Sequence, residues 1–198
     1  MKRTLLIVTA ISFFVAGLGV CAFAKGPESI RIGVNAPLTG DIPKVGEGTK
    51  FAAQMWLEDV NAAGGIEVGG KKYKVELIIE DNESKAESAV KANTKLITEE
   101  DVLAIVGPQS SKQAIPAGGK ANELCCSLIC GWFFFGETSF VGLFVFGGCF
   151  LVSFLGLVVA FFIKDEFGFK KAAVLYDVAS DYPKGLAEFF KAAWEKQN

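Results

Sequence analysis

The chain has 198 residues, the length of one domain or slightly more. Its 20 basic and 22 acidic side chains give a net charge of -2, which argues against a nucleic-acid-binding surface, because such a surface needs clustered basic residues. Histidine is absent, so the commonest general base and the commonest metal ligand are both missing. The hydrophobic share of 51% is high for a soluble domain, and it is unevenly distributed along the chain.

The first 24 residues have the pattern of an export signal. Two basic residues at positions 2 and 3 precede an apolar stretch at 5–20, and the sequence Ala-Phe-Ala at 22–24 fits the rule for signal cleavage. A membrane anchor is the alternative, but 16 apolar residues are short for a transmembrane helix. We therefore expect a signal peptide at 1–24 and a mature chain that begins at Lys25.

Residues 30–122 alternate between strand and helix patterns three times. Short apolar or alternating runs indicate strands, and apolar residues that recur every three or four positions indicate helices. The predicted elements are a strand at 30–34, a helix within 46–63, a hairpin of 66–68 and 73–79, a helix opened by a capping box at 84–87, a strand at 102–106 and a helix within 112–122. This order predicts an α/β fold with a doubly wound parallel sheet, in which ligands bind at the carboxyl ends of the strands.

The strand at 102–106 and the turn after it carry the strongest functional signal. The strand is almost continuously apolar, which is typical of burial on both faces. Gly107 and Pro108 end it, and Ser110 and Ser111 precede a helix. Because the first N–H groups of a helix lack partners and attract anions, the turn is a candidate seat for a ligand carboxylate. The alternative is that Ser110 or Ser111 only caps the helix.

Several motifs carry a family resemblance together. They are APLTGD at 36–41, NAAGGI at 61–66, KKYKVELIIEDNES at 71–84, VGPQSS at 106–111 and KKAAVLYDVASDYPKGLAEFF at 170–190. These stretches resemble the leucine/isoleucine/valine-binding family, whose members are periplasmic solute-binding proteins of type I fold that serve ABC importers. The resemblance covers roughly residues 28–124 and 164–198.

The resemblance implies two α/β lobes that close around a branched-chain amino acid or a similar small carboxylate or amide. It assigns the carboxylate seat to Ser111, with Ser110 and Gln109 beside it. The mouth of the site falls to Leu38 and Thr39. It further implies a periplasmic protein with an ABC transporter permease as its partner, without a cofactor, a metal or catalytic activity.

Tyr182 matches a tyrosine of the second lobe that flanks the ligand in the family. The alternative is a half-exposed aromatic residue that only stabilises the start of a helix. The first lobe is expected at 25–148, with an aberrant apolar part at 124–148, and the start of a truncated second lobe at 149–198. The last helix, after Asp177, carries an apolar stripe for which we predict no partner.

The stretch 124–163 departs from the family pattern. It holds ten of the 18 phenylalanines and a single charge, Glu137. Residues 130–136 are mostly aromatic where the family has a polar ligand-binding loop, so we expect branched-chain amino acids to bind weakly. Three explanations are open for this stretch. It is a corrupted or artificial version of the family sequence, which is the explanation we favour. Otherwise it contains a transmembrane helix from Phe140 to Ile163, or it is a buried core segment. The transmembrane case would make the protein a membrane-anchored receptor with one extracytoplasmic lobe.

Four of the five cysteines also lie in this stretch, at 125, 126, 130 and 149. A zinc site is poorly supported, because the sequence has neither histidine nor a CxxC pair. We predict that these cysteines are small buried hydrophobic residues. No nucleophile–base pair is recognisable, so the sequence favours a binding protein over an enzyme.

Overall fold

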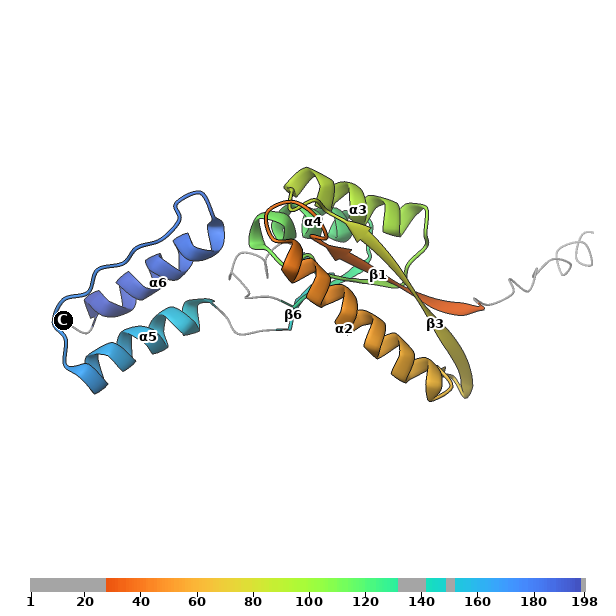
Figure 1. Cartoon of the computed structure of the whole chain (residues 1–198), viewed down its shortest axis with the longest axis horizontal. Coiled ribbons are helices and arrows are strands. Elements are labelled where there is room, and N and C mark those ends of the chain that lie inside the picture. The colour runs from red at the N-terminus through yellow and green to blue at the C-terminus, as the bar shows by residue number, and fades with distance from the viewer. Residues whose placement is uncertain (1–27, 132–141, 149–151, 197–198) are drawn as a thin grey trace, which may run out of the picture.

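A single, mostly parallel sheet positions the loops of interest (Figure 1). The structure is a computed structural model that describes residues 28–131, 142–148 and 152–196. The signal peptide expected at 1–24 and most of the aromatic loop expected at 130–136 lie outside the described residues.

The sheet has six strands in the order β2-β3-β1-β4-β5-β6. β1 pairs in parallel with both β3 and β4, and β5 and β6 continue the parallel arrangement. β2 is the antiparallel partner of β3, which confirms the predicted hairpin. The bounds are β1 (Ser29–Ala36), β2 (Ile66–Val68), β3 (Lys71–Asp81), β4 (Ala104–Val106), β5 (Ser127–Cys130) and β6 (Val145–Gly147). The carboxyl ends of β1, β3 and β4 therefore lie at one edge, as the doubly wound prediction requires.

Three helices cover the sheet: α2 (Pro43–Ala62), α3 (Ala86–Thr98) and α4 (Ser111–Glu123). α2 packs on β1 and β3, whereas α3 and α4 pack against each other and against the sheet. The chain passes from β1 outward to β3 and then back to β4, so right-handed connections place α2 and α3 on opposite faces, as Figure 1 shows. Leu96, Ile105 and Leu128 are fully buried in the core between the sheet and the α3/α4 layer.

β4 is buried on one face only, so the predicted burial on both faces is wrong. Ile105 is fully buried, but its neighbour Val106 is 36% exposed. Val106 is aligned with Ile129 and Ile129 with Phe146, and these two are 42% and 51% exposed. The reason is coverage: α2 packs over β1 and β3, which leaves this face of β4, β5 and β6 open.

The start of α3 differs from the capping box predicted at 84–87. Ser84 has a φ of 59°, the helix begins at Ala86, and its N-cap residue Lys85 makes no side-chain cap hydrogen bond. The hydroxyl of Ser84 instead donates to the carbonyl oxygen of Thr39 at 2.8 Å and accepts from the N–H of Ile42 at 3.2 Å. Ser84 thus ties the loop after β3 to the loop after β1.

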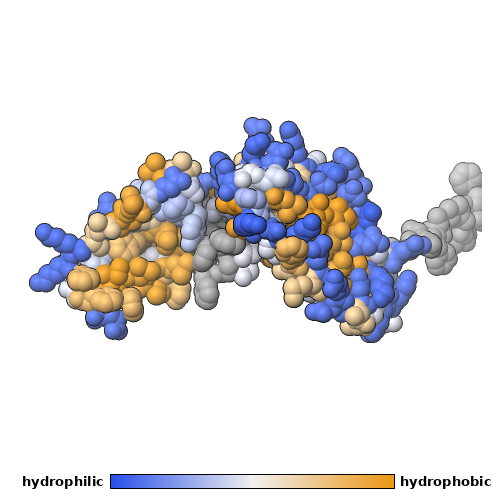
Figure 2. All heavy atoms as spheres, viewed as in Figure 1, coloured by the Kyte–Doolittle hydropathy of each residue, from blue (hydrophilic) through white to orange (hydrophobic). Residues whose placement is uncertain are grey.

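The C-terminal part consists of α5 (Val152–Phe167), an extended segment and α6 (Asp181–Lys196). The two helices pack closely, because Gly156 of α5 lets the backbone of α6 approach. Ala160, Phe190 and Ala193 form their shared core. The prediction that the last helix lacks a partner is therefore wrong. Apolar side chains remain exposed over the outer side of α5, where Figure 2 shows a large hydrophobic area.

The segment from Phe140 to Ile163 is not one helix. Val145–Gly147 forms β6 and pairs with β5, and α5 begins only at Val152. Within the described part of the chain, no helix combines the length and the apolar character that a bilayer span needs. The prediction of one transmembrane helix from Phe140 to Ile163 is therefore wrong.

The cysteine prediction holds only in part. Cys126 and Cys130 are buried, whereas Cys125 is exposed, with a φ of 54° just after α4. Burial raises the pKa of the Cys126 thiol. Cys149 lies outside the described residues.

Candidate ligand-binding site

The predicted site residues of the first lobe lie on two loops at the carboxyl edge of the sheet. Leu38 and Thr39 follow β1, and Gln109, Ser110 and Ser111 follow β4. Because β1 and β4 are adjacent and parallel, both loops leave the sheet at the same edge. The residues at the end of β3 and in the loop after it, Asp81 and Ser84, form hydrogen bonds with the loop after β1.

Gly107 shapes the turn between β4 and α4. Its φ is 100°, and a Cβ atom at this position would overlap the carbonyl oxygen of Asn35 at the end of β1. The backbone N–H of Gly107 donates to the carbonyl oxygen of Ile129 at 2.9 Å. This amide is therefore not available to a ligand, and any anion seat begins further along the turn.

The next N–H groups of the turn, those of Gln109, Ser110, Ser111 and Lys112, donate to no acceptor in the described part of the chain. The carbonyl oxygen of Ser110 accepts from Gln113 and Ala114, which opens α4. Ser110 occupies the N-cap position of α4, but its side chain makes no cap hydrogen bond, so the interpretation that its hydroxyl caps the helix is wrong. Ser111 is the first residue of α4 and is 8% exposed. The turn thus gathers several unused donors at the positive end of a helix.

The loop after β1 is fixed by the carboxylate of Asp81. Oδ1 accepts from the N–H groups of Leu38, Thr39 and Glu83 at 2.9, 3.2 and 2.8 Å. Oδ2 accepts from the hydroxyl of Thr39 at 2.6 Å. Thr39 was predicted to line the site, but its two donors are engaged within the protein. Leu38 remains a candidate for apolar contact with a ligand, because only its backbone is engaged.

The same bonds set the ionisation of Asp81. Burial alone would raise the pKa of this carboxyl group, but the hydrogen bonds from Thr39, Glu83 and Leu38 outweigh burial and hold the pKa below its usual value of 3.8. Asp81 is therefore an ionised structural group at neutral pH, with four donors around it. Its role is to hold the edge of the site.

Tyr182 lies in the first turn of α6 and is partly buried, and this burial raises the pKa of its phenol group. α6 contacts α4, and its N-terminal end approaches the first lobe (Figure 1). Tyr182 thus belongs to the helix that contacts α4, and its part in a ligand site stays a prediction.

Two buried amide side chains of the α4 turn have unused oxygen atoms. Oε1 of Gln109 and Oε1 of Gln113 are enclosed by protein and accept no hydrogen bond in the described part of the chain. Gln113 was not predicted from the sequence, because a glutamine on a helix gives no signal of its burial. Three buried asparagines near the same edge, Asn35, Asn82 and Asn93, were missed for the same reason.

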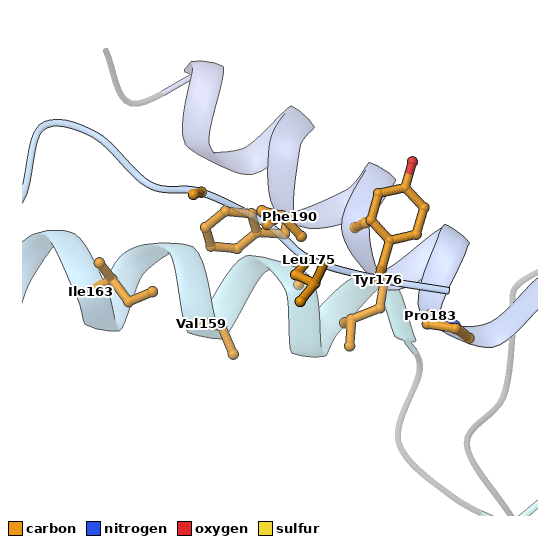
Figure 3. Close-up of a pocket in the computed structure, with 11 residues that line it drawn as sticks. Val159, Ile163, Leu175, Tyr176, Pro183 and Phe190 are labelled. Carbon is orange, nitrogen blue, oxygen red and sulfur yellow. The ribbon is translucent and has the colours of Figure 1, made fainter. Parts of the chain in front are cut away.

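A separate apolar pocket of about 360 Å³ lies between α5, the extended segment 173–176 and α6 (Figure 3). Val159, Leu175 and Phe190 are among its lining residues, and none of the lining side chains carries a charge. This pocket shares no lining residue with the α4 turn, so the two are distinct. Within the described ranges, no group of three metal-ligating side chains occurs.

A family model described as periplasmic binding protein matches residues 29–198. The chain therefore belongs to the periplasmic binding protein family, and its mostly parallel sheet with flanking helices matches a lobe of the type I fold. Leu/Ile/Val-binding protein homolog 3 of Brucella melitensis is 30% identical over 184 residues, 92% of this chain and 48% of that protein. The amino acid binding protein of Pseudomonas aeruginosa is 31% identical over 183 residues, 92% of this chain and 46% of that protein.

Solved structures agree with the family. The substrate-binding protein LivJ of the branched-chain amino acid transporter of Streptococcus pneumoniae, in complex with isoleucine, has a TM-score of 0.78 and 30% identity. The match covers 84% of this chain and 47% of that protein. The leucine-binding protein LivK of Thermotoga maritima has a TM-score of 0.74 and 26% identity, over 85% of this chain and 46% of that protein. The chain thus spans about half the length of the curated relatives it matches.

Proposed function

We propose that this chain provides the first lobe, and the beginning of the second, of an extracytoplasmic solute-binding protein of an ABC importer. The solute is a small carboxylate of the branched-chain amino acid type, and the partner is a membrane permease. The unused N–H groups at the start of α4 are the observation that carries the proposal. Two relatives support the same class of ligand: one is named as a homolog of a Leu/Ile/Val-binding protein, and the other was solved in complex with isoleucine.

The α4 turn suits a carboxylate for two physical reasons. Its N–H groups from Gln109 to Lys112 donate to no acceptor among the described residues, and the helix dipole places partial positive charge at the same point. Hydrogen bonds to a charged acceptor contribute about 1.5–3 kcal/mol each, more than neutral ones. Ser111 adds a hydroxyl donor on the first turn of the helix.

The remaining predicted residues provide the walls of the site. Leu38 lies on the loop that Asp81 fixes, and Tyr182 lies on the helix of the second lobe that approaches α4. A ligand held between them favours the closed arrangement of two lobes, which couples occupancy to recognition by a transporter. This mechanism requires binding and closure but no catalytic group.

The experiment is a titration of the full chain with L-leucine and L-isoleucine, followed by NMR so that weak binding is measured. Ser111→Ala should weaken binding by roughly tenfold to hundredfold, because a charged group loses a hydrogen bond worth about 1–3 kcal/mol. Thr98→Ala is the matched control, since the hydroxyl of Thr98 donates only to Thr94 within α3. Equal affinities for both variants and the unchanged chain would remove Ser111 from the site.

A further inference from the structure

Three asparagine side chains lie completely buried beneath the carboxyl edge of the sheet. Asn35 belongs to β1, Asn82 follows β3, and Asn93 lies in α3. Burying an amide group is unfavourable unless its hydrogen-bonding atoms find partners, and apolar side chains would fill the same space at lower cost. The hydrogen bonds of these side chains therefore call for a functional explanation.

The three side chains form one continuous chain of hydrogen bonds. Nδ2 of Asn82 donates to Oδ1 of Asn35 at 2.8 Å. Nδ2 of Asn35 donates to Oδ1 of Asn93 at 2.8 Å and to the carbonyl oxygen of Ala89 at 2.9 Å. Nδ2 of Asn93 donates to the carbonyl oxygen of Ala117 in α4 at 2.8 Å. In each of the three asparagine side chains, both the amide oxygen and the amide nitrogen take part in a hydrogen bond.

At the Asn82 end, this series of hydrogen bonds continues through Ser84 to the loop after β1. The N–H of Ser84 donates to Oδ1 of Asn82 at 3.0 Å, and the hydroxyl of Ser84 donates to the carbonyl oxygen of Thr39 at 2.8 Å. The backbone N–H of Asn82 donates to the carbonyl oxygen of Ala36 at 3.0 Å. One network therefore runs from the loop that carries Thr39 to the helix that begins at Ser111.

The network ends on the backbone of α4. The bond from Nδ2 of Asn93 to the carbonyl oxygen of Ala117 joins the middle of α4 to α3. Pro116, beside Ala117, has no N–H group, so α4 has one internal hydrogen bond fewer, the one to the carbonyl oxygen of Lys112, and contacts from outside contribute more to holding this helix in place. A network whose members are all satisfied is rigid and specifies one arrangement.

We propose that this asparagine network positions the ligand site, with Asn93 and Asn82 as positioning residues that do not touch the ligand. It holds the loop after β1 and the N-terminal turn of α4 in one relative arrangement before a ligand arrives. The consequence for ligand affinity rests on the proposed function, but the coupling between the two loops does not. Cutting the network at either end should therefore loosen the other end.

Hydrogen exchange on the full chain without ligand tests this coupling. Asn82→Ala should speed exchange of the Ala114 N–H at the start of α4, and Asn93→Ala should speed exchange of the Ser84 N–H, each by about tenfold or more beyond the change in global stability. Asn61→Ala is the matched control. Asn61 bridges α2 to β3 through both backbone groups of Val75, at 2.9 Å each, and belongs to no part of the network.

The outcomes separate this inference from the proposed function. Faster exchange at the distant loop in the two network variants, but not in Asn61→Ala, supports the network whether or not leucine binds. Exchange that changes only beside each substitution, or equally in all three variants, overturns it. If the unchanged chain binds L-leucine, Asn93→Ala should weaken that binding by about tenfold, and unaltered affinity would contradict the positioning role.

Discussion

The hydroxyl of Thr39 donates a hydrogen bond of 2.6 Å to Oδ2 of Asp81, across the gap between the loops that follow β1 and β3. The sequence predicts that Thr39 lies at the entrance of a ligand site, but in the structure its hydroxyl group joins the two loops to each other. Three backbone N–H groups converge on the other oxygen of the same carboxylate. The ionised carboxylate of Asp81 therefore holds the two loops in their relative positions.

Asp81→Asn should destabilise the fold at pH 7 by about 1–3 kcal/mol, because an amide nitrogen cannot accept the hydroxyl hydrogen bond of Thr39. The pKa of Asp81 is lower in the folded chain than its usual value of 3.8. Its contribution to stability is therefore present above that value and is lost as the pH falls through the folded pKa. Urea unfolding between pH 7 and pH 3 measures this, with Glu58→Gln on the exposed face of α2 as the control. An unchanged acid sensitivity in Asp81→Asn would contradict the assignment.

Gly107→Ala should destabilise the fold by more than about 2 kcal/mol, because strain in the left-handed region and overlap with the carbonyl oxygen of Asn35 act together. Gly69→Ala separates the two effects. Gly69 also has a positive φ, of 59°, but a Cβ atom there would meet no other atom, so only about 1 kcal/mol should be lost. Urea unfolding of both variants decides. Equal losses of unfolding free energy in the two variants would show that the turn after β4 can shift to accommodate a Cβ atom, which would contradict the prediction.

Gly156→Ala should separate α5 from α6. A Cβ atom at Gly156 would lie 2.8 Å from Cβ of Phe189 and 2.8 Å from the backbone nitrogen of Phe190, so the two helices must move apart. We expect a loss of about 1–3 kcal/mol in the unfolding of this helix pair. Gly48→Ala, in α2, meets no neighbouring atom and should instead stabilise the protein by about 0.5–1 kcal/mol, through helix propensity alone. Thermal unfolding monitored by circular dichroism should show shifts of opposite sign.

Much of the fold from β1 to α4 is predictable from the sequence, because local patterns specify it. Apolar alternation identifies the strands, helical spacing identifies α2 and α3, and the Gly107-Pro108 turn identifies the start of α4. Burial of β4 is less predictable, because it depends on how far α2 extends over the sheet. Ser84 fits a capping motif by spacing, but its left-handed backbone directs the hydroxyl to Thr39 instead.

The interior hydrogen bonds could not be predicted in this way. Asn35 reads as part of a loop in the sequence, yet it is the penultimate residue of β1 and bonds to partners 47 and 58 positions away. No local pattern reports such distant partners. The resemblance to a known family supplies Ser111 and Tyr182 as candidates, but it does not reveal that the donors of Thr39 are already engaged.

The most direct test of the central claim is a comparison of L-leucine with L-leucinamide on the ¹⁵N-labelled chain. The two compounds differ at one end: L-leucine presents a charged carboxylate with two acceptor oxygens, whereas L-leucinamide presents a neutral amide with one, so leucinamide should bind the N–H groups of the α4 turn more weakly. We predict that L-leucine shifts the amide resonances of Gln109, Ser110, Ser111 and Lys112 in a saturable way and that L-leucinamide shifts them only at concentrations about tenfold higher or more. Equal shifts with both compounds, or leucine-induced shifts confined to other parts of the chain, would contradict a carboxylate seat at the start of α4.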